Sequence, residues 1–245
     1  MKIAVILPAY NEGARLAEVA RAASAAHAVD EVVVVDDGST DDTSAVASGV
    51  AGVRLVTLEV NRGKGGAMVA GAEATDADVL LFLDADLIGL RSEHVEAMTR
   101  PIRDGEADMV VGKFSGGRKL TDWSQRIAPN ISGQRAILRS VFADIPDVAS
   151  SRYGVEMAIT RFCHVCRVPT ATVMLRGVTH PMKEEKLGLL RGWLSRWRMY
   201  REILRIVLFT RMPAPSPQAL ARSLRSRATA LKNGRGGSGG DRPSA

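Results

Sequence analysis

The chain has 245 residues, which is enough for one large domain or two small ones. Its net charge of +6 equals the charge of residues 211–245 alone, where seven Lys or Arg residues stand against one Asp. The basic character therefore belongs to a tail, and the rest of the chain is neutral overall. Aromatic residues make up only 4%, which argues against a nucleic-acid reader that stacks bases on aromatic rings.

The two cysteines, Cys163 and Cys166, offer only half of the ligands that a structural zinc requires. Two reduced thiols are the expected state, which fits a cytoplasmic protein, and a metal or redox role stays open. No apolar stretch approaches the roughly 20 residues that cross a bilayer. We therefore expect a protein that is soluble or lies on a membrane surface, such as the inner membrane face.

The first half of the chain alternates short apolar runs with helical patterns. Runs without polar alternation are typical of strands covered on both faces, as in a parallel sheet. Here they are "IAVIL", "VVVV", "VRLVTL" and "VLLFL", and the helical patterns between them span Ala14–His27, Thr43–Ser48 and Gly65–Thr75. This order predicts an open α/β sheet with helices on both faces.

The second half of the chain is less regular. A weaker strand pattern at Asp108–Val111 precedes the Gly-rich basic stretch "GKFSGGRKLTDW". Helical patterns follow at Ser132–Val141 and Tyr153–Arg161, and "TATVML" predicts a late strand. Gly188–Thr210 predicts a long amphipathic helix, and the Pro, Ser, Gly and Arg residues after it predict a disordered tail.

Polar residues follow the four predicted strands of the first half, as "PAYNEG", "DDGSTDD", "NRGKGGA" and "DAD". Ligands of an open α/β sheet gather at the carboxyl ends of its strands, so we expect a ligand site there. Asp84 and Asp86 lie two positions apart, and both would face one side if the strand continued through them. Paired carboxylates suit Mg²⁺ or Mn²⁺ that carries a substrate phosphate.

Lys64 and Arg62 place positive charge opposite these acids, and the glycines around Lys64 let the backbone approach a ligand closely. This stretch matches neither the phosphate-binding P-loop pattern GxxxxGK[ST] nor the dinucleotide-binding pattern GxGxxG. The sequence therefore argues against a kinase or ATPase and against an NAD-dependent enzyme.

In this order, "VILPAYNE", "VVVVDDGSTDDT", "NRGKGGA" and "LFLDAD" resemble the nucleotide-binding half of family 2 glycosyltransferases, and the resemblance covers roughly residues 1–180. It implies the GT-A fold, which is a Rossmann-like open mixed sheet flanked by helices. Together with this resemblance, which applies to the first two regions, the sequence patterns divide the chain into a nucleotide-sugar-binding half at 1–112, an acceptor-binding half at 113–187, an amphipathic helix at 188–211 and a disordered basic tail at 212–245.

The resemblance also implies roles for single residues. The loop after the first strand borders the nucleoside through Pro8, Ala9, Tyr10 and Glu12. Asp37 accepts a hydrogen bond from the base, and Lys64 also lies near the base. Asp84 faces the ribose and the metal, and Asp86 holds the metal on the diphosphate.

Farther along, the chain resembles the glucosyl-3-phosphoglycerate synthases and their relatives. "SGGRKLTDW" resembles their acceptor-phosphate loop, which implies that Gly117 and Arg118 hold an anionic acceptor. "SGQRAILR" resembles the segment that lines their sugar pocket, and "YGVE" resembles their sugar-contacting motif with Tyr153 and Glu156. "RGVTH" ends in His180, which resembles the third metal ligand of that group.

These residues also have ordinary explanations. Arg118 could be a solvated charge, Glu156 could pair with Arg152 one helical turn earlier, and His180 could be a simple loop histidine. Compared with that group, we expect the N-terminal extension to be missing and the tail to be different, which leaves the acceptor open. Polyprenyl-phosphate glycosyl- and mannosyltransferases, which share the first half equally well, therefore stay an alternative.

We predict a metal-dependent glycosyltransferase that moves a hexose from UDP-glucose or GDP-mannose to a small phosphorylated acceptor such as 3-phosphoglycerate. The expected catalytic residues are Asp86, which holds the Mg²⁺ or Mn²⁺ that neutralises the leaving diphosphate, and Glu156, which is the base if the enzyme inverts. A retaining enzyme needs no such base, and the stereochemistry stays open. A sugar-nucleotide pyrophosphorylase and a non-catalytic nucleotide-sugar-binding module are further alternatives.

The predicted helix at 188–211 carries an apolar and aromatic stripe at helical spacing, made of Trp193, Trp197, Tyr200, Leu204 and Val207. The stripe would pack on the sheet or on a second copy in a homodimer. Alternatively, Trp, Tyr and basic residues are typical of helices on a membrane surface, where the basic tail would add attraction.

Overall fold

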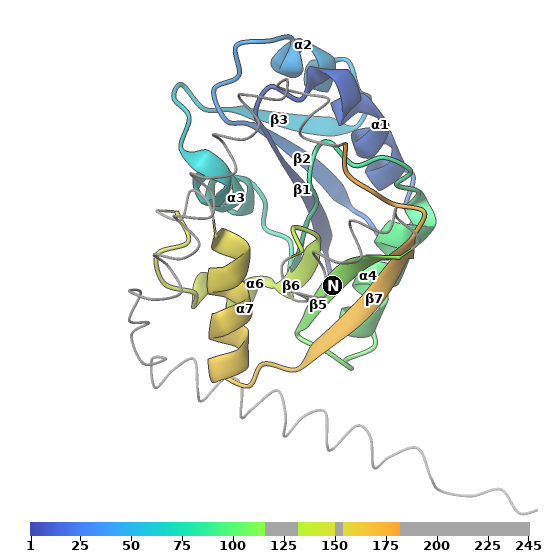
Figure 1. The fold of residues 1–245 in the computed structure, drawn as a ribbon, viewed down its shortest axis with the longest axis vertical. Coiled ribbons are helices and arrows are strands. Elements are labelled where there is room, and N and C mark those ends of the chain that lie inside the picture. Colours follow the sequence, from blue (N-terminus) through green and yellow to red (C-terminus); the bar gives the residue numbers. More distant parts are fainter. Residues whose placement is uncertain (116–131, 150–153, 182–245) are drawn as a thin grey trace, which may run out of the picture.

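A computed structural model of the chain describes residues 1–115, 132–149 and 154–181. They form a seven-stranded sheet in the order β3-β2-β1-β4-β6-β5-β7, with helices packed on both faces (Figure 1). The open mixed α/β sheet predicted from the sequence is confirmed. Residues named above that lie outside the described part are Gly117, Arg118, Arg152, Tyr153, the helix at 188–211 and the tail at 212–245.

The first half is a run of parallel strands joined by helices. Its elements are β1 (Ile3–Ala9), α1 (Gly13–Ser24), β2 (Glu31–Asp36), α2 (Thr43–Ser48), β3 (Val53–Thr57), α3 (Gly63–Glu73) and β4 (Val79–Phe82). β1 pairs in parallel with β2 and β4, and β2 pairs in parallel with β3. The strands and helices predicted for this half are confirmed, with small shifts at their ends.

The second half turns the parallel sheet into a mixed one. Its elements are α4 (Ser92–Arg103), β5 (Met109–Ser115), β6 (Arg135–Leu138), α6 (Arg139–Ala143), α7 (Val155–Val165) and β7 (Thr170–Arg176). β6 runs antiparallel to both β4 and β5, and β7 runs parallel to β5. The strand predicted at the weak pattern, the late strand and the helix around the "YGVE" motif are confirmed as β5, β7 and α7.

The helix predicted at Ser132–Val141 is wrong. Arg135–Leu138 forms strand β6, and the helix that follows begins only at Arg139. β6 lies between β4 and β5 and pairs with both of them. Two ladders of backbone hydrogen bonds and burial within the sheet outweigh the local helical pattern, because strand preference depends mostly on the neighbours that a strand packs against.

Two other elements differ from the sequence analysis. Helix α4 was not predicted, although Val95, Met98 and Ile102 recur at helical spacing and Pro101, a residue that usually breaks helices, lies only near its end. The run that forms β3 was predicted to be covered on both faces. β3 lies at the sheet edge instead, and Arg54 is exposed there.

Alternate residues of the central strands enter two separate cores. On β1, Val5 and Leu7 pack in the core that includes α1 and α4, whereas Ile6 packs in the core that includes α3 and α7. Successive side chains of a strand point to opposite faces, so a continuous apolar run fills both cores. A Cβ added at Gly71 of α3 would lie 2.4 Å from Cγ2 of Ile6, so this helix lies directly on β1.

The strand order reverses between β1 and β4. β2 and β3 extend the sheet on one side of β1, and α3 returns the chain to place β4 on the other side. Ligands of open α/β sheets bind in the crevice at the carboxyl ends of the strands where this reversal occurs. The residues that follow Ala9 and Phe82 therefore occupy the expected position for a site. No helix of the described part is long and apolar enough to span a membrane.

Candidate functional site

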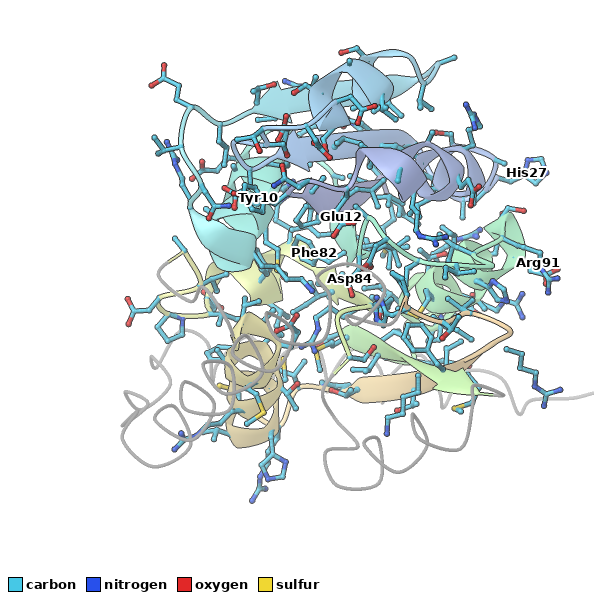
Figure 2. All side chains as sticks on the ribbon, turned by 45° about the horizontal axis from the view of Figure 1, so that its top comes forward. Tyr10, Glu12, His27, Phe82, Asp84 and Arg91 are labelled. Carbon is cyan, nitrogen blue, oxygen red and sulfur yellow. The ribbon has the colours of Figure 1, made fainter. Side chains whose placement is uncertain are left out.

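Three ligand-type side chains converge beyond the end of β4. Ligand atoms of Asp84, Asp86 and His180 all lie within 4.8 Å of one another. His180 Nδ1 is 3.2 Å from Asp86 Oδ1, and His180 Nε2 is 3.5 Å from Asp84 Oδ2. Figure 2 shows Asp84 beyond Phe82, with Tyr10 and Glu12 on the neighbouring loop after β1. In the part of the chain that the structure describes, this is the one group with the composition of a metal site.

The two aspartates do not meet in the way that the sequence suggested. β4 ends at Phe82, and Ala85 and Asp86 lie in a turn, so the alternation of a continuing strand does not apply. The turn brings the second carboxylate back toward the first. The convergence was predicted, and its expected cause was wrong.

A short backbone bridge brings His180 to this turn from the other half of the chain. Ile88 N donates to Thr179 O at 2.9 Å, and Thr179 N donates to Ile88 O at 3.1 Å. Gly177 and Gly89 both have a positive φ, and a Cβ at Gly89 would lie 2.5 Å from the carbonyl oxygen of Gly177. Glycine at these two turns lets the segment after β7 approach closely enough to place the histidine.

Electrostatics in this cluster favours charged side chains. Burial lowers the pKa of His180, but the hydrogen bond to Asp86 and the charges of Asp84 and Asp86 raise the pKa by more than burial lowers it. The net shift of the pKa is therefore upward. Burial raises the pKa of Asp84, but the charges of Lys64 and His180 outweigh this and lower it overall. The cluster therefore attracts positive charge, whether a proton on the imidazole or a cation.

Lys64 links this cluster to helix α7. Its Nζ donates to Asp84 Oδ1 at 2.5 Å and to Glu156 Oε1 at 2.6 Å. Burial lowers the pKa of Lys64, but the two carboxylates raise it on balance, and Lys64 in turn lowers the pKa of Glu156 against the effect of burial. The resemblance to family 2 glycosyltransferases implied that Lys64 lies near the base of the bound nucleoside. The structure shows its ammonium between the first aspartate of the DAD motif and the acid of the YGVE motif.

The segment Ser132–Arg135 also packs against this cluster. Gln134 Nε2 donates to Asp84 Oδ2 at 2.8 Å, and Gln134 is fully buried. A Cβ added at Gly133 would lie 2.4 Å from Asp84 Oδ2 and 2.8 Å from Lys64 Nζ. The motif "SGQRAILR" pointed to this segment, but none of its residues was predicted as a site residue. A run of small and polar residues that enters a buried strand was the signal that could have found them.

The loops after β1 and β2 are tied to each other by polar contacts. Asn11, which has a φ of 55°, accepts from the backbone of Thr40 at 2.9 Å, and its own backbone donates to Ser39 Oγ at 3.0 Å. The backbone of Glu12 donates to Thr43 Oγ1 at 2.9 Å. These contacts hold in place the loop that carries four predicted nucleoside contacts, of which Ala9 is buried and Tyr10 is exposed.

Asp37 joins the second polar loop to the third. Its two carboxylate oxygens accept from the backbone N–H groups of Arg62 and Gly63 at 2.7 and 2.8 Å, at the start of α3. A carboxylate at a helix N-terminus satisfies donors that have no partner within the helix. These two contacts fix the loop after β2 against the start of α3.

The two cysteines are buried free thiols at the C-terminal end of α7, whereas Glu156 lies in its first turn. Cys163 Sγ lies 3.5 Å from Met109 Sδ, and both cysteines belong to the apolar core. No described His, Asp or Glu joins them in a metal-type group. Their packing is that of small apolar side chains.

The fold and the site together define the class. An open α/β sheet with an acidic, cation-attracting cluster at its reversal point is a ligand-binding domain of the nucleotide-binding type. The sequence matches the model of glycosyl transferase family 2 over residues 4–159, which is more than half of the chain. The protein belongs to this family.

Two relatives illustrate what the chain is similar to. Glucosyl-3-phosphoglycerate synthase of Mycobacterium tuberculosis is 31% identical over 64% of this chain and 59% of that protein. Undecaprenyl-phosphate 4-deoxy-4-formamido-L-arabinose transferase of Pseudomonas paraeruginosa is 29% identical over 67% of this chain and 50% of that protein. The chain thus spans 50–59% of the length of these relatives.

Solved structures support the same relationship. Glucosyl-3-phosphoglycerate synthase from Mycobacterium tuberculosis in complex with Mn²⁺, UDP and phosphoglyceric acid has a TM-score of 0.66 at 27% identity, covering 84% of this chain and 77% of that chain. The same enzyme with Mg²⁺ and UDP has a TM-score of 0.59 at 28% identity, covering 80% and 79%. This likeness confirms the GT-A fold predicted from the sequence.

Proposed function

We propose that the protein is a metal-dependent glycosyltransferase that moves a hexose from UDP-glucose or GDP-mannose to a small phosphorylated acceptor such as 3-phosphoglycerate. The cluster of Asp84, Asp86 and His180 at the reversal point of the sheet carries this proposal, because a nucleoside diphosphate needs a cation to bind beside carboxylates. The relatives whose structures contain UDP, Mn²⁺ and phosphoglyceric acid support the choice of donor and acceptor.

The donor atoms of the cluster fit Mn²⁺ better than Mg²⁺. Carboxylate oxygens suit both ions, whereas an imidazole nitrogen is a ligand that transition metals accept more readily. Asp84, Asp86 and His180 would hold the ion. When bound, it would supply positive charge to the diphosphate as the bond between sugar and phosphate breaks.

The other residues of the site orient the sugar and the nucleoside. The ammonium of Lys64 keeps Glu156 ionised, and an ionised carboxylate can accept hydrogen bonds from hydroxyl groups of the sugar or the acceptor. It is also the protonation state that a general base needs, if the reaction inverts the anomeric centre. Asp37 and the loop from Pro8 to Glu12 border the nucleoside in this proposal.

A second acceptor class is favoured by one observation. The undecaprenyl-phosphate transferase of Pseudomonas paraeruginosa covers as much of this chain as the phosphoglycerate relative does. A polyprenyl phosphate, like phosphoglycerate, presents an anionic oxygen. The alternative is therefore the same metal-dependent transfer to a lipid phosphate at a membrane surface.

The test begins with binding and ends with transfer. Thermal unfolding with UDP-glucose or GDP-mannose, each with and without Mn²⁺, identifies the donor by the larger metal-dependent shift. Release of the nucleoside diphosphate is then measured with 3-phosphoglycerate and with a short prenyl phosphate, and NMR of the product gives its anomeric configuration. Release with 3-phosphoglycerate alone supports the proposal, release with the prenyl phosphate alone supports the second class, and binding without release leaves a non-catalytic module.

A further inference from the structure

Arg135 is a fully buried arginine directly beneath the site. It is on β6, opposite Phe82 of β4, and its relative exposure is 0%. Among the described residues, no carboxylate lies within ion-pair distance of its guanidinium, and its Nε has no hydrogen-bond partner. A buried charge costs free energy unless it is paired, so its presence in a core strand calls for a reason other than stability.

The guanidinium of Arg135 connects two segments that both form the site. Its Nη2 donates to the carbonyl oxygen of Ser132 at 2.6 Å. Its Nη1 donates to the carbonyl oxygen of Glu156 at 3.1 Å and to Thr160 Oγ1 at 3.3 Å. One rigid fork therefore ties the loop that packs on Asp84 to the first turn of α7.

Packing alone does not fix that first turn in place. Helix α7 lies on the sheet through Val155, Ile159 and Phe162, which are apolar contacts in the second core. Apolar burial is not directional, so it holds a helix against a sheet without fixing its exact shift or rotation. Hydrogen bonds from a planar guanidinium are directional, and they act on the residue whose side chain enters the site.

We infer that Arg135 is a positioning residue that sets the place of Glu156 at the reacting sugar by linking α7 to the loop beneath Asp84. This inference rests on the proposed function, in which Glu156 contacts the sugar or the acceptor. Arg135 itself does not touch the substrate. It acts through the backbone of Glu156, and it leaves the nucleotide-binding loops of β1 and β2 unaffected.

The first test compares two arginine variants of the full-length chain. In R135M, kcat should fall on the order of 10- to 100-fold, as expected when a reacting group shifts by about 1 Å. The Kd of UDP with Mn²⁺ should change less than kcat does, because Arg135 reaches the metal ligand Asp84 only through the loop of Gly133 and Gln134. The matched control is R139M, since Arg139 on the neighbouring helix also donates to backbone carbonyls, those of Ala72, Thr75 and Ala77, outside the site. Its kcat should stay within about twofold.

The second test asks whether Arg135 acts through Glu156. The double variant R135M/E156Q should be about as slow as E156Q alone, because the second change removes what the first one positions. Full multiplication of the two losses would overturn the inference, and so would a kcat for R135M equal to that of R139M. If R135M folds poorly, R135K tests the same inference. Lysine keeps the positive charge but not the planar guanidinium with its directional hydrogen bonds, so the kcat of R135K should drop at least about fivefold. A wild-type kcat in R135K would also overturn the inference.

A structural readout separates this inference from the proposed function. Crystals of R135M without substrate should show Glu156 moved away from Lys64, whatever donor and acceptor the enzyme uses. An unchanged contact between Glu156 and Lys64 would refute the positioning role. Absence of transfer by the wild-type protein with every donor and acceptor would refute the proposed function and leave the crystallographic result standing.

Discussion

A methyl group at Gly133 should damage the proposed metal site without unfolding the protein. A Cβ there would lie 2.4 Å and 2.8 Å from the two carboxylate oxygens of Asp84 and 2.8 Å from Lys64 Nζ. Carbon and oxygen atoms that are not bonded need about 3.5 Å, so the carboxylate must move by about 1 Å. Lys64 can swing away on its flexible chain, but Asp84 is short and has little room.

The size of the effect follows from that displacement. Metal–oxygen distances tolerate about 0.2 Å, so a shift of about 1 Å takes Asp84 out of a shared site with Asp86 and His180. Disturbing the groups that orient a ligand commonly costs 10- to 100-fold in metal affinity. Added volume in a packed site costs about 1–3 kcal/mol of stability, which lowers the melting temperature but leaves a folded domain.

Isothermal titration of Mn²⁺ into G133A with saturating UDP measures the affinity, and a thermal scan measures the stability. G49A is the matched control, since Gly49 has a φ of −79° at the end of α2 and its added Cβ would meet Val46 O at an ordinary 3.5 Å. G49A should bind Mn²⁺ like wild type. An Mn²⁺ affinity of G133A within about twofold of wild type would refute the reasoning, because the clash would then not reach the ligand set.

Three further outcomes are expected at the same site. In D86A, turnover should fall by about 1,000-fold or more, with a melting temperature close to that of wild type, since the variant removes a carboxylate that repels Asp84; activity that survives without added cation would exclude the metal mechanism. The pKa of His180 is raised above its ordinary value of 6.5, so Mn²⁺ must displace a proton from the imidazole when the pH is below that raised pKa. The affinity for Mn²⁺ should therefore rise with pH until the imidazole is neutral. This dependence of Mn²⁺ affinity on pH should vanish in H180Q, and a dependence that persists there would assign the displaced proton to another residue. In K64M, Asp84 and Glu156 lose their shared, partly buried partner, so the free energy of unfolding should fall by about 3 kcal/mol or less in urea titrations, and a loss no larger than that of a surface lysine variant would show that the two acids are not held by it.

The sequence predicted those features that depend on neighbours along the chain. β1, β2 and β4 are continuous apolar runs that enter the sheet centre, and the motifs after them converge because parallel strands share one carboxyl edge. The pairing of Asp86 with His180 was predicted through resemblance, since the two residues are 94 positions apart and no local pattern connects them.

What the sequence missed depends on contacts across the fold. The helical pattern at Ser132–Val141 gives way to β6 only because β4 and β5 are both present to pair with it. The contact between Lys64 and Glu156 spans 92 positions, and the close fit of Gly133 against Asp84 exists only once α3, β4 and β6 are packed. Local propensity carries no information on such contacts.

The bridge between Ile88 and Thr179 also determines when the site can exist during synthesis. A ribosome releases the DAD turn long before His180 has emerged, so a nascent chain has two carboxylates but lacks its imidazole. A growing polypeptide therefore cannot assemble the complete cluster of Asp84, Asp86 and His180, and a product truncated before β7 lacks its imidazole. The three side chains come together only when β7 has joined the edge of the sheet and the turn after it has closed onto the loop after β4.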